Sequence, residues 1–314
     1  MKIAFTTELP KEGFQRLFAK DNGDGRFEIS DFPEADVLVC TFDYKVSRET
    51  IDAMPHLKLI ANFGAGYNNI DLEACQERGI RVTNTPQPVI EPTAELAFAL
   101  MIDVARRVSE FDRAVRSQLL EVSRFDGFGV MKNLSHSLYG KTLGILGMGR
   151  IGQALARRAK ASGMRIIYHN RHPLSPDIEA LYDAQYVDFQ TLLQDSDFVS
   201  LNLPYTPEVH HIIGKPELGM MKRNAYLINT ARGAHVDEQA LVEALKSGII
   251  AGAALDVYEF EPHISAELLQ LPNVVLSPHT GTGTWEGRIA MCENVTDNIL
   301  AFTANESNKM NIVL

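Results

Sequence analysis

The feature that most constrains this chain is a glycine pattern near its middle. The range Gly147–Gly152 has the spacing G-x-G-x-x-G, and it separates an apolar run at 142–146 from a helical stretch at 153–160. A second apolar run at 164–168 completes a strand–helix–strand unit. Such glycines allow a tight turn and close backbone approach, and the helix N-terminus offers N–H groups to phosphates. We therefore expect a dinucleotide-binding domain; a glycine-rich turn without a ligand is the alternative.

The tip of the second apolar run indicates which dinucleotide would bind. An NAD site usually carries an acid there, which accepts hydrogen bonds from the ribose 2′-hydroxyl. Here Asn170, Arg171 and His172 follow the run, and the first carboxylate is Asp177. An arginine with neighbouring donors suits a 2′-phosphate. We favour NADP on these grounds; NAD stays possible, with Arg171 stacked on its adenine.

Composition excludes several classes of protein. The 314 residues are 45% apolar and 22% charged, as in an ordinary globular chain with room for two domains. The net charge of −10 argues against nucleic acid or an anionic membrane as the partner. No apolar run approaches the length of a membrane span, and the first residues read as a strand rather than a signal peptide. The widely spaced Cys40, Cys75 and Cys292 predict a reducing cytoplasmic location and no metal site.

Short apolar runs alternate with helical or loop segments along the rest of the chain. This alternation predicts an α/β fold with two Rossmann-like domains and doubly wound parallel sheets. We expect a discontinuous, flavodoxin-like substrate domain at 1–96 and 286–314, and an NAD(P)-binding domain at 97–285. The expected strands lie at 3–5, 37–39, 59–61, 142–146, 164–168, 198–201, 226–228, 253–255 and 274–276, and the main helices at 12–20, 47–54, 72–78, 92–119, 153–160 and 285–302.

Residues 20–25 resemble the start of a calcium-binding loop. Aligned on that pattern, however, the first ligand position is Lys20 and the twelfth is Asp31 rather than Glu. A solvated turn is the better interpretation. The segment 123–137 reads as a loop that crosses to the fingerprint strand.

Three predicted strands are followed by residues suited to carbonyl reduction. Arg232, Glu261 and His279 each come shortly after an apolar run, and ligands bind at such strand ends in parallel sheets. An arginine holds a 2-oxo acid with two N–H donors, a histidine donates a proton, and a carboxylate orients the imidazole. Taken singly, Arg232 could be a surface ion-pair residue and His279 a core histidine. Their combination behind a dinucleotide fingerprint favours catalysis.

The whole chain resembles the D-isomer-specific 2-hydroxyacid dehydrogenase family. The resemblance is carried by motifs at 147–152, 229–233, 254–262 and 277–280, with further matches at 79–86 and 93–97. It implies hydride transfer between NAD(P)H and a 2-oxo acid to give a D-2-hydroxy acid, as in glyoxylate/hydroxypyruvate reductase or D-lactate dehydrogenase.

The same resemblance assigns roles to individual residues. Arg232 would bind substrate, His279 would be the acid/base, and Glu261 rather than the nearby Glu259 would be its partner. The backbone of Gly64, Ala65 and Gly66 would bind the substrate carboxylate. The cofactor contacts expected are Gly147, Gly149, Arg150, Ile151, Asn170, Arg171, His172, Pro204, Thr230, Ala231, Asp256 and His279, of which Asp256 and Ala231 would orient the nicotinamide.

Several alternatives remain open from sequence. A corepressor-like dinucleotide sensor would share this fold, and a formate dehydrogenase would carry Gln where Pro278 stands. The aromatic residues Phe42, Tyr44, Phe63 and Tyr67 would either line a pocket or pack, and Trp285 would be a pocket wall or a core residue. An apolar stripe within 92–107 (Leu96, Leu100 and Val104), together with the family resemblance, predicts a homodimer.

Overall fold

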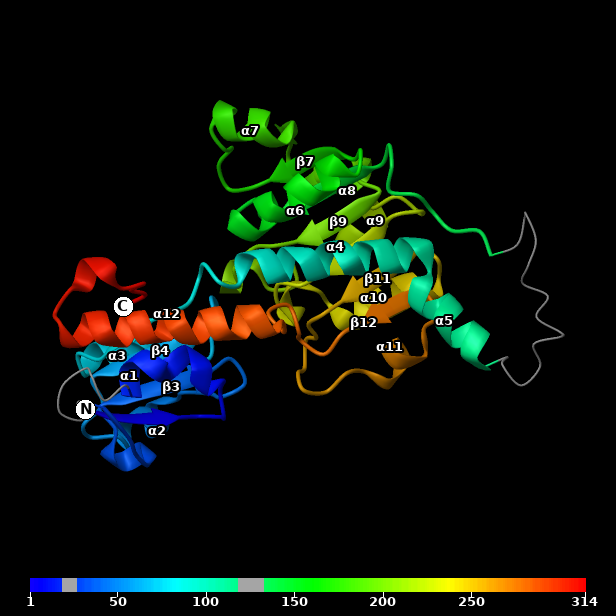
Figure 1. The fold of residues 1–314 in the computed structure, drawn as a ribbon. Coiled ribbons are helices and arrows are strands. Elements are labelled where there is room, and N and C mark those ends of the chain that lie inside the picture. The colour runs from blue at the N-terminus through cyan, green and yellow to red at the C-terminus, as the bar shows by residue number, and fades with distance from the viewer. Residues whose placement is uncertain (19–26, 118–132) are drawn as a thin grey trace. The chain divides into compact units, whose positions relative to one another are not determined.

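The computed structural model describes residues 1–18, 27–117 and 133–314 (Figure 1). The calcium-like turn at 20–25 and most of the loop at 123–137 lie outside these ranges. The chain forms two compact units, Met1–Pro92 with Thr282–Leu314, and Thr93–Gly281. The boundaries that we expected at 96 and 285 each lie four residues farther along the chain.

The first unit is built on a five-stranded parallel sheet in the order β2-β1-β3-β4-β5. This is the strand order of flavodoxin-like folds. Two inner strands, the central β3 and its neighbour β4, are buried along their whole length, which is why both read as continuous apolar runs. The strands are β1 Lys2–Phe5, β2 Glu28–Ile29, β3 Val37–Thr41, β4 Leu59–Phe63 and β5 Arg81–Thr83.

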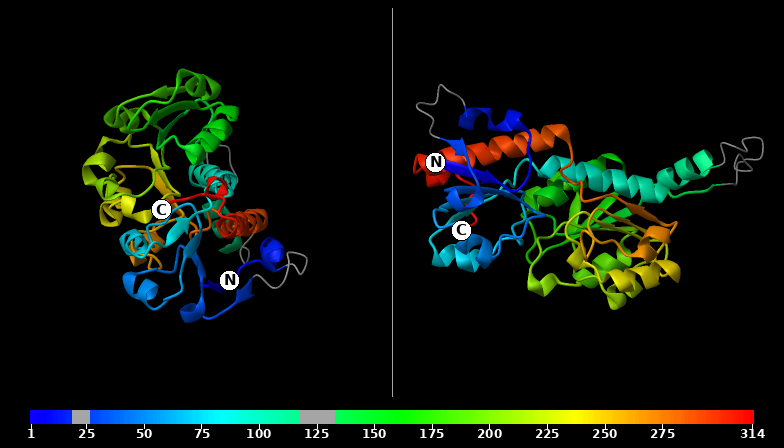
Figure 2. Two further views of the ribbon diagram at one scale, coloured as in Figure 1. Left: turned by 90° about the vertical axis from the view of Figure 1, so that its left-hand side faces the viewer. Right: turned by 90° about the horizontal axis from the view of Figure 1, so that it is seen from below.

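The C-terminal helix α12 (Trp285–Thr303) belongs to this first unit, as the sequence suggested. Figure 2 shows it beside the N-terminal helical segment, and it also packs on β4. Gly13 permits this close approach, because a Cβ there would lie 2.2 Å from the Cβ of Cys292. The other helical elements are η1 Lys11–Phe14, α1 Gln15–Phe18, η3 Phe32–Glu34, α2 Arg48–Asp52, α3 Leu72–Glu77 and η7 Ser307–Lys309.

The second unit has a seven-stranded parallel sheet in the order β12-β11-β10-β9-β6-β7-β8. Counted from β6 this is 7-6-5-4-1-2-3, which contains the dinucleotide-binding order 3-2-1-4-5-6. The order reverses between β6 and β9, and a ligand crevice is expected at that point. The strands are β6 Thr142–Leu146, β7 Arg165–His169, β8 Ala184–Tyr186, β9 Phe198–Leu201, β10 Tyr226–Asn229, β11 Gly252–Leu255 and β12 Val274–Leu276.

Helices cover this sheet, and several share an apolar core with β9, β10 and β11. The long helix expected at 92–119 is divided in two, because Arg107 has the left-handed φ of 57°. The helical elements are α4 Ile90–Arg106, α5 Val108–Ser117, α6 Arg150–Ala161, α7 Pro176–Tyr182, α8 Phe189–Asp195, η5 Pro207–Val209, α9 Lys215–Met220, η6 Gly233–His235, α10 Glu238–Lys246 and α11 Ala266–Gln270.

Burial decides several of the open alternatives. Trp285 is 66% exposed, so it is not a core residue of this chain. Phe63 is buried and Tyr44 packs edge-on against Phe32, whereas Phe42 and Tyr67 are exposed. The three cysteines are free and buried. A search of the described helices finds none that combines the length and apolar character needed to cross a membrane.

Candidate active site

The glycine turn leads from β6 into α6 and leaves room for a phosphate group. Gly147 has φ +94°, and a Cβ there would lie 2.7 Å from the backbone nitrogen of Leu203. A Cβ on Gly152 would lie 2.6 Å from the carbonyl oxygen of Gly147, so the helix can approach only with glycine. Gly149 caps α6, and a Cβ built there meets nothing within 4 Å. With the first-turn N–H groups of Arg150 and Ile151 beside this open space, the turn fits a pyrophosphate.

Two polar atoms at neighbouring strand ends lack a partner. The hydroxyl of Thr230 after β10 and Oδ1 of Asn202 after β9 are buried without a hydrogen bond to any described residue. The amide of Asn202 donates to the carbonyl and hydroxyl of Ser200, at 3.2 and 3.0 Å. Buried polar atoms are normally satisfied, so these two are positioned to meet polar groups of a ligand. Thr230 was predicted from sequence, whereas Asn202 was not.

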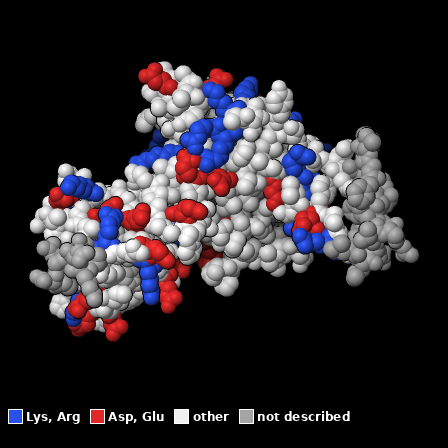
Figure 3. All heavy atoms as spheres, in the orientation of Figure 1, with Lys and Arg blue, Asp and Glu red and all other residues white. Residues whose placement is uncertain are grey.

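The residues after β7 combine one fixed and two exposed side chains. Oδ1 of Asn170 accepts the backbone N–H of Met148 at 2.7 Å, which ties the tip of β7 to the glycine turn. Arg171 and His172 are exposed. The Thr206 hydroxyl lowers the pKa of Glu208, and the nearby charge of Arg171 lowers that pKa further. Lys and Arg side chains gather over α6 in Figure 3, and the basic residues of its last turn are Arg158 and Lys160.

Arg232 is positioned by a side chain that closes its loop. The amide of Asn229 donates to the carbonyl of Arg232 at 2.8 Å and its oxygen accepts the N–H of Ala231 at 3.0 Å. Arg232 itself donates to the carbonyl of Ala231 at 2.6 Å. The next residue, Gly233, has no space for a Cβ, which would lie 1.9 Å from the backbone of Tyr258. This contact brings the arginine loop against the segment that carries Glu261.

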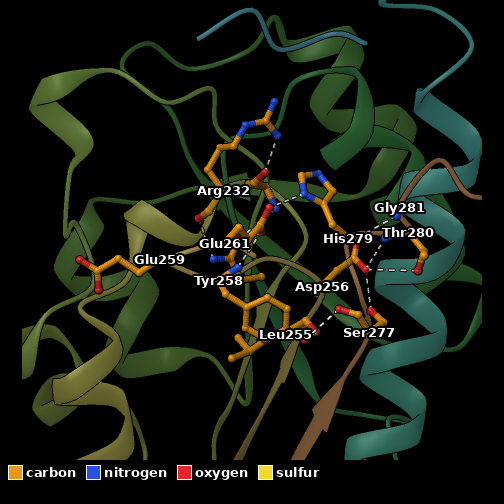
Figure 4. A network of polar contacts seen from close by, with 12 residues as sticks. Arg232, Leu255, Asp256, Tyr258, Glu259, Glu261, Ser277, His279, Thr280 and Gly281 are labelled. Carbon is orange, nitrogen blue, oxygen red and sulfur yellow. Dashed lines mark hydrogen bonds and ion pairs between the residues drawn. The ribbon is translucent and has the colours of Figure 1, made fainter. Parts of the chain in front are cut away.

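Glu261 and His279 form a close pair. Nδ1 of His279 lies 2.8 Å from Oε2 of Glu261, and Oε1 of Glu261 accepts the backbone N–H of Tyr258 at 2.9 Å. Figure 4 shows the carboxylate directed at the imidazole, with Arg232 on the same side of the sheet. Nδ1 thus faces the carboxylate, and Nε2 is the ring nitrogen on the other side of the imidazole.

Asp256 fixes the loop on which His279 stands. Its buried carboxylate accepts the hydroxyl of Ser277 at 2.6 Å and the N–H groups of Thr280 and Gly281, each at 2.7 Å. Its carbonyl accepts the N–H of His279 at 2.8 Å. These bonds hold His279 at a left-handed φ of 52°, a conformation that is uncommon outside glycine. The geometry therefore gives Asp256 a positioning function, whatever contact it makes with a cofactor.

Glu259 lies close to Glu261 in sequence but faces another way (Figure 4). Its Oε1 lies 2.6 Å from Nε2 of His211, and its Oε2 accepts the backbone N–H of Glu238 at 3.1 Å. The sequence alone did not separate the two glutamates. In the structure, Glu261 is the one beside His279.

The charges in the site influence one another. Burial opposes ionisation of Glu261, but the hydrogen bond and charge of His279 outweigh it, so the pKa of Glu261 lies below its usual value. Burial lowers the pKa of Arg232, and the negative charge of Glu261 counteracts that effect. The guanidinium and the carboxylate are therefore near enough to stabilise each other in their charged forms.

The loop Gly64–Gly66 lies in the first unit, at the end of β4. The amide of Asn62 donates to the carbonyls of Gly64 and Gly66, at 3.1 and 2.7 Å. The amide of Asn84 donates to the carbonyl of Ala65 at 2.9 Å. Since all three carbonyls are held in this way, the N–H groups are what the loop can offer to an anion.

The remaining predicted contacts also lie at strand ends of the second unit. Pro204 is exposed in the segment after β9, and Ala231 lies between Thr230 and Arg232 after β10.

A residue that sequence reasoning missed is His235 in η6. It is fully buried, neither ring nitrogen bonds to a described residue, and its ring centroid lies 5.9 Å from that of Tyr205.

Comparison with known proteins identifies the family. Residues 98–281 match the D-isomer specific 2-hydroxyacid dehydrogenase, NAD binding domain. A glyoxylate reductase of Thermococcus litoralis is 52% identical over 273 residues, which cover 87% of this chain and 82% of the relative.

Two solved structures are similar over nearly the whole chain. A glyoxylate reductase from Paecilomyes thermophila has a TM-score of 0.85 and 36% identity, covering 100% of this chain and 98% of that one. An NADPH-dependent glyoxylate/hydroxypyruvate reductase from Sinorhizobium meliloti, in complex with NADP and malonate, has a TM-score of 0.84 and 31% identity, covering 96% and 93%. The chain therefore belongs to the D-isomer specific 2-hydroxyacid dehydrogenase family.

Proposed function

We propose that this chain reduces a small 2-oxo acid of the glyoxylate or hydroxypyruvate class to the D-2-hydroxy acid, with NADPH as the preferred donor. The reaction class, NAD(P)-dependent reduction of 2-oxo acids to 2-hydroxy acids, follows from its relatives. The choice of a small acid rests on the names of those relatives, which are glyoxylate or glyoxylate/hydroxypyruvate reductases. The observation that carries the chemistry is the 2.8 Å pair of Glu261 and His279 beside Arg232.

The bound nicotinamide would supply the hydride, and the protein would supply the proton and the charge stabilisation. Arg232 would bind the carboxylate and carbonyl of the substrate with its two-pronged donor set. His279 would donate a proton from Nε2 to the carbonyl oxygen as negative charge develops there. Glu261 would hold the ring through Nδ1 and stabilise the protonated imidazole.

The loop of Gly64, Ala65 and Gly66 would add backbone donors for the substrate carboxylate. Its carbonyls are already engaged by Asn62, Asn84 and the N–H of Thr85, the last at 2.9 Å. A carboxylate bound by backbone N–H groups needs no charged partner in that loop.

The preference for NADPH rests on the exposed Arg171 and the absence of an acid at 170–172. A charge-assisted hydrogen bond contributes about 1.5–3 kcal/mol, which corresponds to roughly a 10- to 100-fold preference. Asn170 and His172 would add donors. Glu208 acts against this preference, because its negative charge lies near enough to interact with Arg171.

Kinetics with two cofactors and a panel of 2-oxo acids test the proposal. We expect glyoxylate and hydroxypyruvate to exceed pyruvate and aromatic 2-oxo acids in kcat/KM, with NADPH favoured over NADH. R171A should raise the KM for NADPH about 10- to 100-fold and leave that for NADH nearly unchanged. N170D keeps an oxygen for the N–H of Met148 and should shift the preference toward NADH. An equal rise in the KM for NADPH and for NADH in R171A would instead indicate that Arg171 stacks on the adenine.

The same panel separates the enzyme from its rivals. A corepressor-like sensor would bind dinucleotide with negligible turnover on every acid. A formate dehydrogenase would oxidise formate, but this chain has Pro278 before His279 where that activity expects Gln. The cytoplasmic location stays a prediction from composition.

The homodimer also stays a proposal, with a changed rationale. Leu100 and Val104 are buried within the chain, so the stripe on α4 is not the free apolar surface that we expected. Helix α5 is the better candidate, because it buries none of its residues and exposes Val108 and Val115. A mass measurement by light scattering at micromolar concentration tests this, and a monomer would refute it.

A further inference from the structure

A cluster of side chains of the types that bind metal ions lies outside the proposed active site. His210, His211 and Glu259 each offer one ligand atom, and these atoms lie within 4.8 Å of one another. Nε2 of His211 is 2.6 Å from Oε1 of Glu259, and the two imidazole rings stack at 3.9 Å. We propose that these three residues bind a divalent transition-metal ion of the zinc class.

The donor set selects the class of ion. Two imidazoles and one carboxylate suit Zn²⁺ and Cu²⁺, whereas Ca²⁺ and Mg²⁺ prefer oxygen alone. Ligand atoms on a tetrahedral zinc lie roughly 3.4 Å apart, given bonds of about 2.0–2.1 Å. The contact between His211 and Glu259 would open by less than about 1 Å, and the wider separations would close. Three protein ligands leave the fourth position for water.

Neighbouring groups already orient the ligands. The hydroxyl of Tyr205 lies 3.3 Å from Nδ1 of His210, so that nitrogen can donate to the phenol and Nε2 would be the metal ligand. Glu259 receives the N–H of Glu238 on Oε2, and its own N–H donates to the Glu238 carboxylate at 3.2 Å. Partners of this kind, which fix a ring or a carboxylate from behind, are typical of protein metal sites.

The backbone conformation also favours a metal site over a simple ion pair between His211 and Glu259. Adjacent residues in extended chain point to opposite sides. His211 instead has the left-handed φ of 51°, and its ring lies against that of His210. A pair between His211 and Glu259 alone needs neither the stacked His210 nor its contact with Tyr205. The three cysteines are buried and do not offer a competing surface site.

A bound ion would join two segments that border the active site. Tyr205–His211 follows Pro204, one of the predicted cofactor contacts, and Glu259 is two residues before Glu261. The metal would therefore hold the loop after β9 against the segment that carries the partner of His279. We expect zinc to raise the midpoint of thermal unfolding, because an ion that binds the folded chain stabilises it.

Zinc titration of the untagged full chain, freed of metal by chelation, tests the proposal. Calorimetry should show one Zn²⁺ per chain, and H210A should weaken its binding by about 100-fold or more. Y205F removes only the hydroxyl and should weaken binding roughly 10-fold. With Cu²⁺ as probe, electron paramagnetic resonance should report two nitrogen ligands in the original chain and one in H210A.

Matched variants identify where the ion binds. H56A removes an exposed histidine from the other unit and should leave zinc binding unchanged. H279A should also retain it. Retention in H210A, or loss in H279A, would overturn the proposal. Because the readout is binding rather than turnover, its failure would leave the proposed reaction untouched, and failure of that reaction would leave the metal site standing.

Discussion

Two histidine–carboxylate pairs share one short segment of the second unit, and they differ in what surrounds them. Glu261 meets His279 at 2.8 Å, and Glu259 meets His211 at 2.6 Å. Judged by residue type and distance, the pairs are nearly equivalent. Judged by position, His279 follows β12 near Arg232, whereas His211 lies in the loop after η5.

The comparison shows that the neighbours of a pair decide its chemistry. The His279 pair stands beside a guanidinium and on a loop held by Asp256. At the nearby strand ends, buried atoms of Thr230 and Asn202 make no hydrogen bond to the described residues. The His211 pair has a second imidazole and a phenol instead. The first set of neighbours suits proton transfer to a polarised carbonyl, and the second suits a metal ion.

The sharpest test of this difference replaces each histidine with alanine. H279A should lower kcat by roughly 10²–10⁴-fold, because general acid catalysis is lost. H211A should change kcat by no more than a few-fold. Steady-state rates measure both, and cofactor binding by fluorescence titration should stay near normal in each. Comparable losses in the two variants would break the distinction.

Replacing Arg232 tests the neighbour that the His211 pair lacks. R232K keeps the positive charge but removes the planar, two-pronged donor. We expect a fall of roughly 10²–10³-fold in kcat/KM for the 2-oxo acid, of the size seen when a donor to a developing oxyanion is removed. A change confined to the thermal midpoint would make Arg232 a structural residue. R223K is a conservative control, because Arg223 is exposed and precedes β10 rather than following the carboxyl end of a strand.

The two glutamates give a crossed pair of variants. E261Q should lower kcat roughly 10²-fold or more, because the amide no longer stabilises the protonated imidazole, and should affect stability little. E259Q should leave kcat within a few-fold of the original and lower the free energy of unfolding by about 1–3 kcal/mol, since its charged hydrogen bonds are weakened. Rates and urea unfolding measure the two effects. The reverse pattern would exchange the roles that the geometry gives them.

The sequence predicted the fold class, the family and the reaction class, and all three are confirmed. Strands at 142–146, 198–201 and 274–276 match to the residue. The first two are buried along their whole length, and parallel strands buried on both faces read as nearly unbroken apolar runs. The three short edge strands β2, β5 and β8 were missed, since they carry too few apolar residues to form a pattern. The break at Arg107 was missed because an arginine gives no sign of a left-handed backbone.

Site prediction succeeded where the chemistry follows a linear motif. Arg232, Glu261 and His279 each stand in one, whereas the choice between Glu259 and Glu261 rested on resemblance alone. The contact of His211 with Glu259 joins residues 48 positions apart, so no local sequence pattern predicts it. His235 and Asn202 gave no signal either, because what sets them apart is buried atoms that bond to none of the residues in 1–18, 27–117 and 133–314. Such features depend on how the strands and loops pack.

His235 extends the comparison to a histidine with no carboxylate, and it predicts the smallest effect. Burial lowers its pKa to about 4, with a smaller contribution from the charge of Arg232. An unfolded histidine has a pKa of about 6.5, so between pH 6.5 and pH 4 the unfolded chain binds more protons than the folded one. Its contribution to stability is therefore complete above pH 6.5 and is lost as the pH falls toward 4. From pH 7 to pH 5 the loss should be about 2 kcal/mol. Urea unfolding at the two pH values measures it, and H235L should reduce the difference by that amount. If H235L lost as much stability between pH 7 and pH 5 as the original chain, protonation of His235 would not be the cause of that loss.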